Sequence, residues 1–199
     1  MGRRPRISYP GAYFHVHTRG NNKGTAFLDS RDRQIFLTLL ERVTVKYEWL
    51  VYSWCLMTSH YHFVICVPED GLSAGMRDLN GGYARWTNFR HGRCDHVFGQ
   101  RFKGEEITTE RHLLEACRYV VLNPVRAGIC EHPVEWRWSS YRASAGLEPP
   151  QPFLALDRLH AMLRELAYEG DDDFDRYVRW VENGLVDSVH AVPGTGFSV

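Results

Sequence analysis

The sequence predicts a mixed α/β (α+β) protein whose elements follow the order β-α-β-β-α-β, with a further helix after the last strand. Two neighbouring runs, at about 49–57 and 60–67, are rich in β-branched and aromatic residues, a composition typical of half-buried strands. Apolar residues recur at helical spacing on both sides of these runs. A chain with 44% hydrophobic and 13% aromatic residues can also bury a substantial core.

The first strand and the first helix are expected near the start of the chain. Polar and apolar residues alternate over 11–19, so His15 and His17 share one face of a strand. Ser30 is a suitable N-cap for a helix that runs to about Tyr47. The two strands described above then follow as a hairpin with a tight connection.

The second helix is expected at 72–90, where apolar residues recur at helical spacing. Gly81 and Gly82 within it could mark a bend, because each glycine costs on the order of 1 kcal/mol in a helix interior. Residues 97–103 are interpreted as the fourth strand or as one arm of a hairpin. These elements complete a β-α-β-β-α-β unit, which is the ferredoxin-like plan.

The helix after the last strand contains two polar residues that are candidates for a functional site, Tyr119 and Asn123. Thr108 or Thr109 can cap this helix, which is expected to run to about Asn123. Pro124 would end or kink it, because proline has no backbone N–H and its ring clashes with the preceding turn. Tyr119 and Asn123 therefore lie one helical turn apart near its end.

The chain is expected to divide into three parts. Residues 1–145 are expected to form the main domain. Residues 146–185 are predicted to be an acidic helical extension at the C-terminal side, with helices at about 154–168 and 172–183. Residues 186–199 are predicted to be a flexible tail.

The formal net charge is zero, but the charge is unevenly distributed. Residues 1–130 hold 18 Lys and Arg against 12 Asp and Glu, a charge of +6, whereas residues 131–199 hold 6 against 12, a charge of −6. Of the 24 basic residues, 21 are arginine, whose planar guanidinium suits phosphate. The first two-thirds of the chain are therefore expected to bind a polyanion, and the last third to be repelled by one.

The spacing of the cysteines and the hydropathy of the chain indicate the cellular compartment. Five cysteines without a Cys-x-x-Cys pair are interpreted as buried apolar thiols rather than as a zinc site or a disulfide framework. No apolar run approaches the roughly 18 residues of a membrane helix. The basic start also lacks the apolar stretch of a secretory signal, so we expect a cytoplasmic protein without a membrane partner.

Two histidines on one strand are the strongest chemical signal. His60 and His62 are separated by one residue, so both imidazoles point to the same face. Such a pair can hold one divalent cation when a second element completes the site. Tyr119 and Asn123 are the best candidates, because a phenol and an amide oxygen beside two imidazoles form a set of groups suited to cleaving a phosphodiester.

Other interpretations of these residues stay open. A His-x-His pair can be simple packing, and Asn123 before Pro124 can be a helix stop. His15 and His17 form a rival pair, interpreted as structural or DNA-facing. Histidine-triad hydrolases would need a third alternating histidine, and two-histidine phosphoesterases need two His-x-Thr/Ser motifs, so neither class fits. The candidate phosphate contacts, each of which could instead belong to a solvated basic face, are Arg19, Arg101, Lys103 and Arg126.

Several stretches taken together resemble the single-tyrosine HUH transposases, and within them the REP-associated tyrosine transposase branch. They lie in the family's order over about residues 9–142. The matching stretches are Phe14-His-Val-His-Thr-Arg-Gly-Asn-Asn22, Cys55-Leu-Met-Thr-Ser-His-Tyr-His62, Leu72-Ser-Ala-Gly-Met76, Arg101-Phe-Lys103, Arg118-Tyr-Val-Val-Leu-Asn-Pro-Val-Arg-Ala-Gly128 and Trp138-Ser-Ser-Tyr141.

The resemblance implies an enzyme that nicks and rejoins single-stranded DNA at hairpin-forming palindromic repeats, with Mg²⁺ or Mn²⁺ as cofactor. It assigns the metal to His60, His62 and Asn123 and the nucleophile to Tyr119. The product would be a 5′-phosphotyrosine and a free 3′-hydroxyl. The resemblance also makes residues 1–145 an HUH endonuclease domain that works as a monomer or a homodimer.

The sequence departs from the family's pattern in three places. Thr58-Ser59 stands where Pro-Asn is commoner, Gly99-Gln100 reverses the usual order, and the acidic region after about residue 150 lies outside the match. Two alternative functions stay open. One is a protein of the same fold that binds DNA hairpins without cutting them, and the other is a metal-dependent hydrolase of small phosphoesters.

Overall fold

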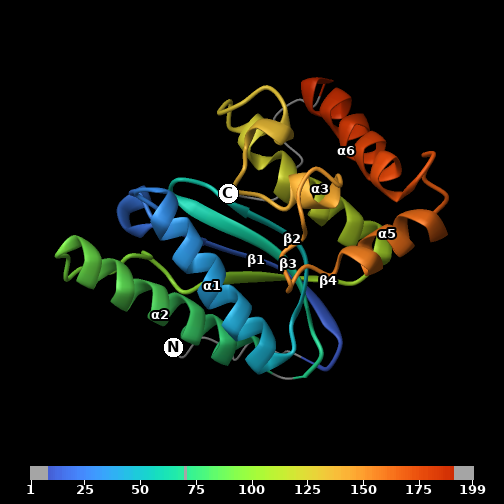
Figure 1. The fold of residues 1–199 in the computed structure, drawn as a ribbon. Coiled ribbons are helices and arrows are strands. Elements are labelled where there is room, and N and C mark those ends of the chain that lie inside the picture. Colours follow the sequence, from blue (N-terminus) through green and yellow to red (C-terminus); the bar gives the residue numbers. More distant parts are fainter. Residues whose placement is uncertain (1–8, 70, 191–199) are drawn as a thin grey trace.

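One four-stranded sheet with helices on both faces dominates the computed structural model, which describes residues 9–69 and 71–190 (Figure 1). In chain order the elements are β1 (Ala12–Arg19), the 3-10 helix η1 (Asn21–Lys23), α1 (Ser30–Tyr47), β2 (Leu50–Leu56), β3 (His60–Val67), α2 (Leu72–His91), β4 (Lys103–Ile107), α3 (Glu110–Arg126), the 3-10 helix η2 (Pro133–Glu135), α4 (Tyr141–Ser144), α5 (Leu156–Glu165) and α6 (Asp173–His190). The strand order is β2-β3-β1-β4, and neighbouring strands are antiparallel. The predicted ferredoxin-like plan is confirmed.

The two faces of the sheet bury different sets of side chains. Alternate residues of β3 point to opposite faces, so Tyr61, Phe63 and Ile65 pack under α1 and α2. Val64 and Cys66 point to the other face, where they pack with α3, α5 and α6. Figure 1 shows this division, with α1 and α2 on one side of the sheet and α3, α5 and α6 on the other.

Several boundaries differ from those predicted. Asp29 rather than Ser30 is the N-cap of α1, and its carboxylate accepts a hydrogen bond from the Asp32 backbone N–H at 3.0 Å. The fourth strand is Lys103–Ile107, not 97–103. Residues 97–102 instead form a connection that pairs with the chain just after β1 through an isolated antiparallel bridge between Phe98 and Gly20, and the Val97 side chain is buried in the core.

Glycine and proline do not break their helices. Helix α2 continues through Gly81 and Gly82, and a Cβ atom added at Gly82 would lie 3.6 Å from Leu39 Cδ2. This is an ordinary van der Waals distance, so the packing of α1 does not depend on glycine at this position, and α2 continues without a break. Helix α3 runs past Pro124 to Arg126. The residues that follow the helix donate backbone hydrogen bonds to the carbonyls of its last turn, for example Ala127 to Asn123 and Ile129 to Pro124.

The acidic extension packs against the outside of α3. Tyr177, Trp180 and Val181 of α6 are buried in the same cluster as α3. The Arg118 guanidinium lies over the Trp180 ring, 5.8 Å from its centroid. A Cβ atom at position 184 would come within 2.6 Å of Arg118 Cδ, so a larger residue there would displace the Arg118 side chain.

The predicted tail and the predicted state of the cysteines can also be compared with the structure. Helix α6 reaches His190 and so enters the predicted tail, whose remainder at 191–199 lies outside the described residues. All five cysteines are free. Cys55, Cys66 and Cys117 are buried, as expected for apolar thiols, whereas Cys130 is partly exposed and Cys94 is exposed. Among the described residues, no helix combines the length and apolarity needed to cross a membrane.

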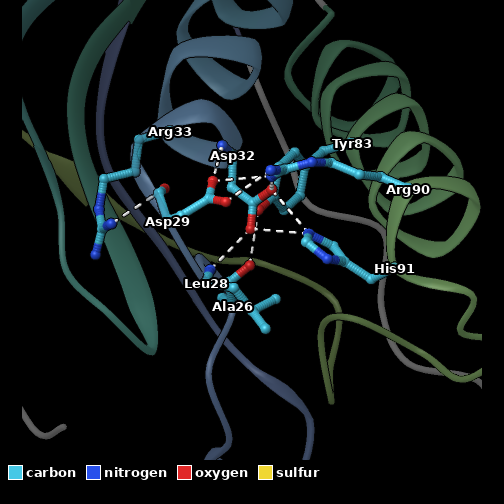
Figure 2. Close-up of polar contacts among 8 residues, drawn as sticks. All are labelled: Ala26, Leu28, Asp29, Asp32, Arg33, Tyr83, Arg90 and His91. Carbon is cyan, nitrogen blue, oxygen red and sulfur yellow. Dashed lines mark hydrogen bonds and ion pairs between the residues drawn. The ribbon is translucent and has the colours of Figure 1, made fainter.

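A buried carboxylate ties the start of α1 to the end of α2. Asp32 is fully buried, and Figure 2 shows it between Arg90, His91 and the backbone at Leu28. It accepts hydrogen bonds from the Leu28 N–H at 2.8 Å and from the Arg90 guanidinium, and its Oδ1 lies 3.0 Å from His91 Nε2. The Arg90 guanidinium also pairs with Asp29 at 2.7 Å. This cluster fixes two helices that cover one face of the sheet.

Replacing the buried carboxylate should be costly. We expect Asp32→Ala to lower the free energy of unfolding by about 2 kcal/mol, because it leaves the Leu28 backbone N–H without its acceptor and the Arg90 guanidinium with Asp29 as its remaining carboxylate partner. Urea denaturation followed by circular dichroism measures the change. As a control, Lys46→Gln breaks an exposed ion pair with Asp78 and should leave stability nearly unchanged. Equal effects of the two variants would contradict this role of Asp32.

Candidate active site

A cavity of about 400 Å³ opens at the end of the sheet where β1 finishes and β3 begins. Seven of the eight site residues expected from the sequence line it: His60, His62, Tyr119, Asn123, Arg19, Arg101 and Lys103. The eighth, Arg126, stacks on Tyr119 instead, with its guanidinium carbon 4.9 Å from the ring centroid. The fold therefore gathers these residues from four separate elements and from the connection before β4.

Strand register places the histidines together. In the antiparallel pair, His17 of β1 lies opposite His62 of β3, and Arg19 lies opposite His60. His15 joins this face because it is two residues before His17. Its ring stacks on that of His62 with centroids 5.2 Å apart, and the His17 and His62 rings are 5.4 Å apart. The sequence treated the two histidine pairs separately, whereas the sheet combines them.

In each histidine predicted to bind the metal, His60 and His62, one ring nitrogen is held by a neighbouring side chain. His62 Nδ1 lies 3.0 Å from His15 Nε2, and His60 Nδ1 lies 3.0 Å from Ser59 Oγ. In each ring, Nε2 is then the nitrogen that remains for a ligand. Metal-binding histidines commonly have the other nitrogen held in this way, so the two imidazoles fit a cation site.

Helix α3 supplies the phenol and the amide. Thr109 caps the helix by accepting a hydrogen bond from the His112 N–H, and the face of the helix opposite solvent packs on β2 and β3. The Tyr119 ring meets the His62 ring edge to face, with centroids 5.9 Å apart. The amide nitrogen of Asn123 donates to the Tyr119 carbonyl at 2.9 Å, which leaves the carboxamide oxygen as the available ligand atom.

Burial sets the charge state of the imidazoles. Removal from water lowers the pKa of His15 to about 3 and that of His60 to about 4, with nearby positive charge from His17 and Arg19 adding to the effect. Burial also lowers the pKa of His62 well below its ordinary value. The histidines are therefore neutral near pH 7, which is the form that binds metal ions.

The pKa of the Tyr119 phenol is raised above its ordinary value. Burial is the largest cause, the negative charge of Glu105 adds to it, and the positive charge of Arg126 opposes it. A phenolate at this position would be stabilised by the guanidinium that lies over its ring. Arg126 therefore has a place in the site that differs from the phosphate contact expected from its charge alone.

The site draws few ligands from the protein. Among the described residues, no group of three or more His, Cys, Asp or Glu side chains is arranged to hold a metal ion. The donor set expected from the sequence, two imidazoles and one amide oxygen, would leave positions for substrate oxygens. These residues fit Mg²⁺ or Mn²⁺ held with the help of a phosphate.

His15 lines the cavity and contacts His62 directly, which is compatible with the structural or DNA-facing role expected for it. The alternation of His15 and His17 on the first strand was the available signal. The register that sets His17 opposite His62 was not visible in the sequence.

Comparisons with known proteins agree with this fold. The family described as "Transposase IS200 like" matches residues 8–122. A solved structure described as the REP-associated tyrosine transposase bound to a REP hairpin aligns with a TM-score of 0.61 and 19% sequence identity, over 75% of this chain and 89% of that chain. A search of curated proteins found no match.

The matched region makes up more than half of the chain and contains all the strands, together with the histidine pair and Tyr119. The fold and this match define a DNA-processing enzyme of the transposase class. The chain belongs to the IS200-like transposase family.

The buried neutral histidines predict acid sensitivity of the metal-free protein. Below pH 6.5 an unfolded chain protonates its histidines, whereas His15 stays neutral in the folded state until about pH 3. The free energy of unfolding should therefore fall as the pH drops below 6.5, by about 2 kcal/mol between pH 6.5 and 5 from His15 alone.

Urea denaturation at pH 7.5 and pH 5, with a chelator present, measures this dependence. His15→Gln should reduce the difference between the two pH values by up to about 2 kcal/mol. An unchanged pH dependence in this variant would show that His15 is not held neutral by burial.

Proposed function

We propose that this chain is a metal-dependent single-stranded DNA endonuclease and strand transferase that acts at hairpin-forming repeats through a 5′-phosphotyrosine intermediate. The observation that carries the proposal is the edge-to-face contact of Tyr119 with His62, inside a cavity whose charged lining is basic. Membership in the IS200-like transposases supports DNA strand transfer. A solved neighbour of the same fold is described as bound to a REP hairpin, which supports a hairpin substrate.

The residues proposed to hold Mg²⁺ or Mn²⁺ are His60, His62 and Asn123. When bound, such a cation polarises the phosphate as a Lewis acid. His15 positions His62 through the contact between their ring nitrogens. Ser59 does the same for His60 through its hydroxyl. Both contacts fix the ring orientation before substrate arrives, which lowers the cost of assembling the site.

Tyr119 is proposed as the nucleophile. Its phenolic oxygen forms a bond to phosphorus while the bond from phosphorus to the 3′-oxygen breaks. The phenol loses one proton and the leaving 3′-oxygen gains one, so the step is balanced. The 5′-phosphotyrosine retains the phosphodiester energy, and attack by a second 3′-hydroxyl releases Tyr119 and reseals the strand without ATP.

The basic residues are proposed to hold the DNA backbone. Arg19, Arg101 and Lys103 line the cavity together with Lys23, and none of the described residues in its lining is Asp or Glu. A strand with one negative charge per phosphate is attracted to such a surface. Arg126 lies over the Tyr119 ring and is proposed to stabilise the phenolate as it attacks.

Removing the phenol oxygen tests the nucleophile. Tyr119→Phe should give no SDS-stable protein–DNA adduct with a labelled single-stranded hairpin and Mn²⁺, because phenylalanine cannot attack phosphorus. Its Kd for the same DNA should stay within about twofold of the wild-type value, since phosphate contacts dominate affinity.

Tyr47→Phe is the matched control, because the Tyr47 hydroxyl donates a hydrogen bond to Asp78 on the opposite face of the sheet. This variant should form the adduct as the wild type does. An adduct in Tyr119→Phe would place the nucleophile elsewhere. Tight binding by the wild type with neither adduct nor cleavage would favour the alternative of a non-cleaving hairpin-binding protein.

Removing either histidine tests the metal site. His60→Ala and His62→Ala should each weaken Mn²⁺ binding by more than about 100-fold in titration calorimetry, and should abolish DNA cleavage. His132→Ala is the control, because His132 lies near Glu182 of α6 and away from the cavity. If both variants bind Mn²⁺ as tightly as the wild type, His60 and His62 are not the metal ligands.

A further inference from the structure

The turn that carries His60 is not stiffened by its own residues. Residues 57–59 connect β2 to β3 and contain neither glycine nor proline, whose backbone preferences define many tight turns. Thr58 is exposed and Ser59 is only half-buried, so their side chains pack little. Backbone contacts from a neighbouring segment therefore matter for the position of His60.

The connection between β1 and α1, residues 20–29, supplies such contacts. The backbone N–H groups of Ala26 and Phe27 both donate to the Thr58 carbonyl, at 2.9 and 3.1 Å. Ala26 and Phe27 are themselves fully buried. A buried part of the connection thus holds the exposed turn two residues before His60.

The start of the same connection makes a further contact with the turn. The Gly20 N–H donates to the Ser59 carbonyl at 2.7 Å. A Cβ atom at position 20 would lie 2.2 Å from the Gly24 carbonyl oxygen, so any other residue would have to displace the backbone here. Ser59 Oγ in turn lies 3.0 Å from His60 Nδ1. The connection therefore holds a residue that contacts the His60 ring directly.

Tyr83 of α2 holds the connection from the side away from the turn. Its hydroxyl donates to the Ala26 carbonyl at 2.7 Å, and Figure 2 shows these two residues beside the buried carboxylate cluster. The Tyr83 side chain is fully buried, and its ring packs against that of Phe27 with centroids 5.3 Å apart. Ala26 thus accepts from Tyr83 and donates to Thr58, so one residue links α2 to the turn.

Tyr83 is a cleaner point of intervention than the nearby Asp32. The Asp32 carboxylate accepts from the Leu28 N–H of the same connection at 2.8 Å, but it also pairs with Arg90. Removing it would disturb the packing of α1 and α2 as well as the connection. Phenylalanine in place of Tyr83 removes one oxygen and keeps the buried ring.

We propose that Tyr83 is a positioning residue for His60. Its hydroxyl fixes Ala26, Ala26 fixes the turn at Thr58, and the turn fixes the direction of the His60 ring. The proposal rests on the proposed function, since it takes His60 as a metal ligand. A ligand that is already held in its binding direction loses less conformational freedom when the cation binds, so Tyr83 adds to metal affinity from the opposite face of the sheet.

Mn²⁺ binding by Tyr83→Phe tests this role. Titration calorimetry should give a Kd about fivefold weaker than that of the wild type, the effect of one neutral hydrogen bond. Tyr47→Phe serves for comparison, because it also removes a hydroxyl hydrogen bond between α1 and α2, to Asp78, but at the far end of α1. This variant should bind Mn²⁺ as the wild type does.

Amide hydrogen exchange of the metal-free protein separates local loosening from a general loss of stability. In Tyr83→Phe, the N–H groups of Ala26 and Phe27 should exchange about fivefold faster. The N–H of Phe63, in a strand paired on both sides by β1 and β2, should be unaffected. Equal acceleration at all three positions would overturn the positioning role.

A second substitution checks the route of the effect. Ser59→Ala releases the His60 ring from the turn. In this background, Tyr83→Phe should weaken Mn²⁺ binding by less than it does alone, because the two substitutions act on the same path. Strictly additive losses would show that Tyr83 acts by another path and would overturn the proposal.

The results for the metal site and for Tyr83 can be told apart. If the wild type binds Mn²⁺ and Tyr83→Phe binds it equally tightly, the positioning role is wrong while the proposed function stands. The same conclusion follows if Tyr47→Phe loses as much affinity as Tyr83→Phe. If the wild type itself binds no Mn²⁺, the proposed metal site is wrong, and the role of Tyr83 is overturned with it.

Discussion

The pairing of β1 with β3 is the constraint on which the site depends. It sets His17 opposite His62 and Arg19 opposite His60. Because side chains alternate along a strand, a shift of one residue in this register would turn the whole group away from the cavity. The opposite faces of the same strands carry Val16, Phe63 and other core residues, so burial of the apolar face enforces the polar arrangement on the other.

Helix α3 is held from both sides. Its apolar face packs on β2 and β3, and Trp180 of α6 lies against Arg118, the residue before Tyr119. The acidic extension therefore has a structural use that its charge did not reveal. It supports the helix that carries Tyr119 from the side away from the cavity, and it keeps its carboxylates out of the basic lining.

Local signals predicted most elements of the fold. The β-branched run around His60 and His62 is a strand, and the helix with Tyr119 and Asn123 follows the last strand as expected. The errors fall where an apolar residue or a small residue has a tertiary use. Val97 is buried in the core although it lies outside the named strands, and Gly82 faces Leu39 of α1 within an unbroken α2. Such uses leave no periodic pattern in the sequence.

The sequence by itself determined the fold class, the uneven charge, and the chemical types of the site residues, because periodicity and side-chain chemistry are local properties. Only the tertiary structure decided that His15 contacts His62, since these residues are 47 positions apart and meet through strand register. It also decided that Arg19, Arg101 and Lys103 line one cavity with the histidines, because the end of β1, the start of β3 and the connection before β4 meet there. Distances across a sheet are set by packing of the whole chain, which no single segment encodes.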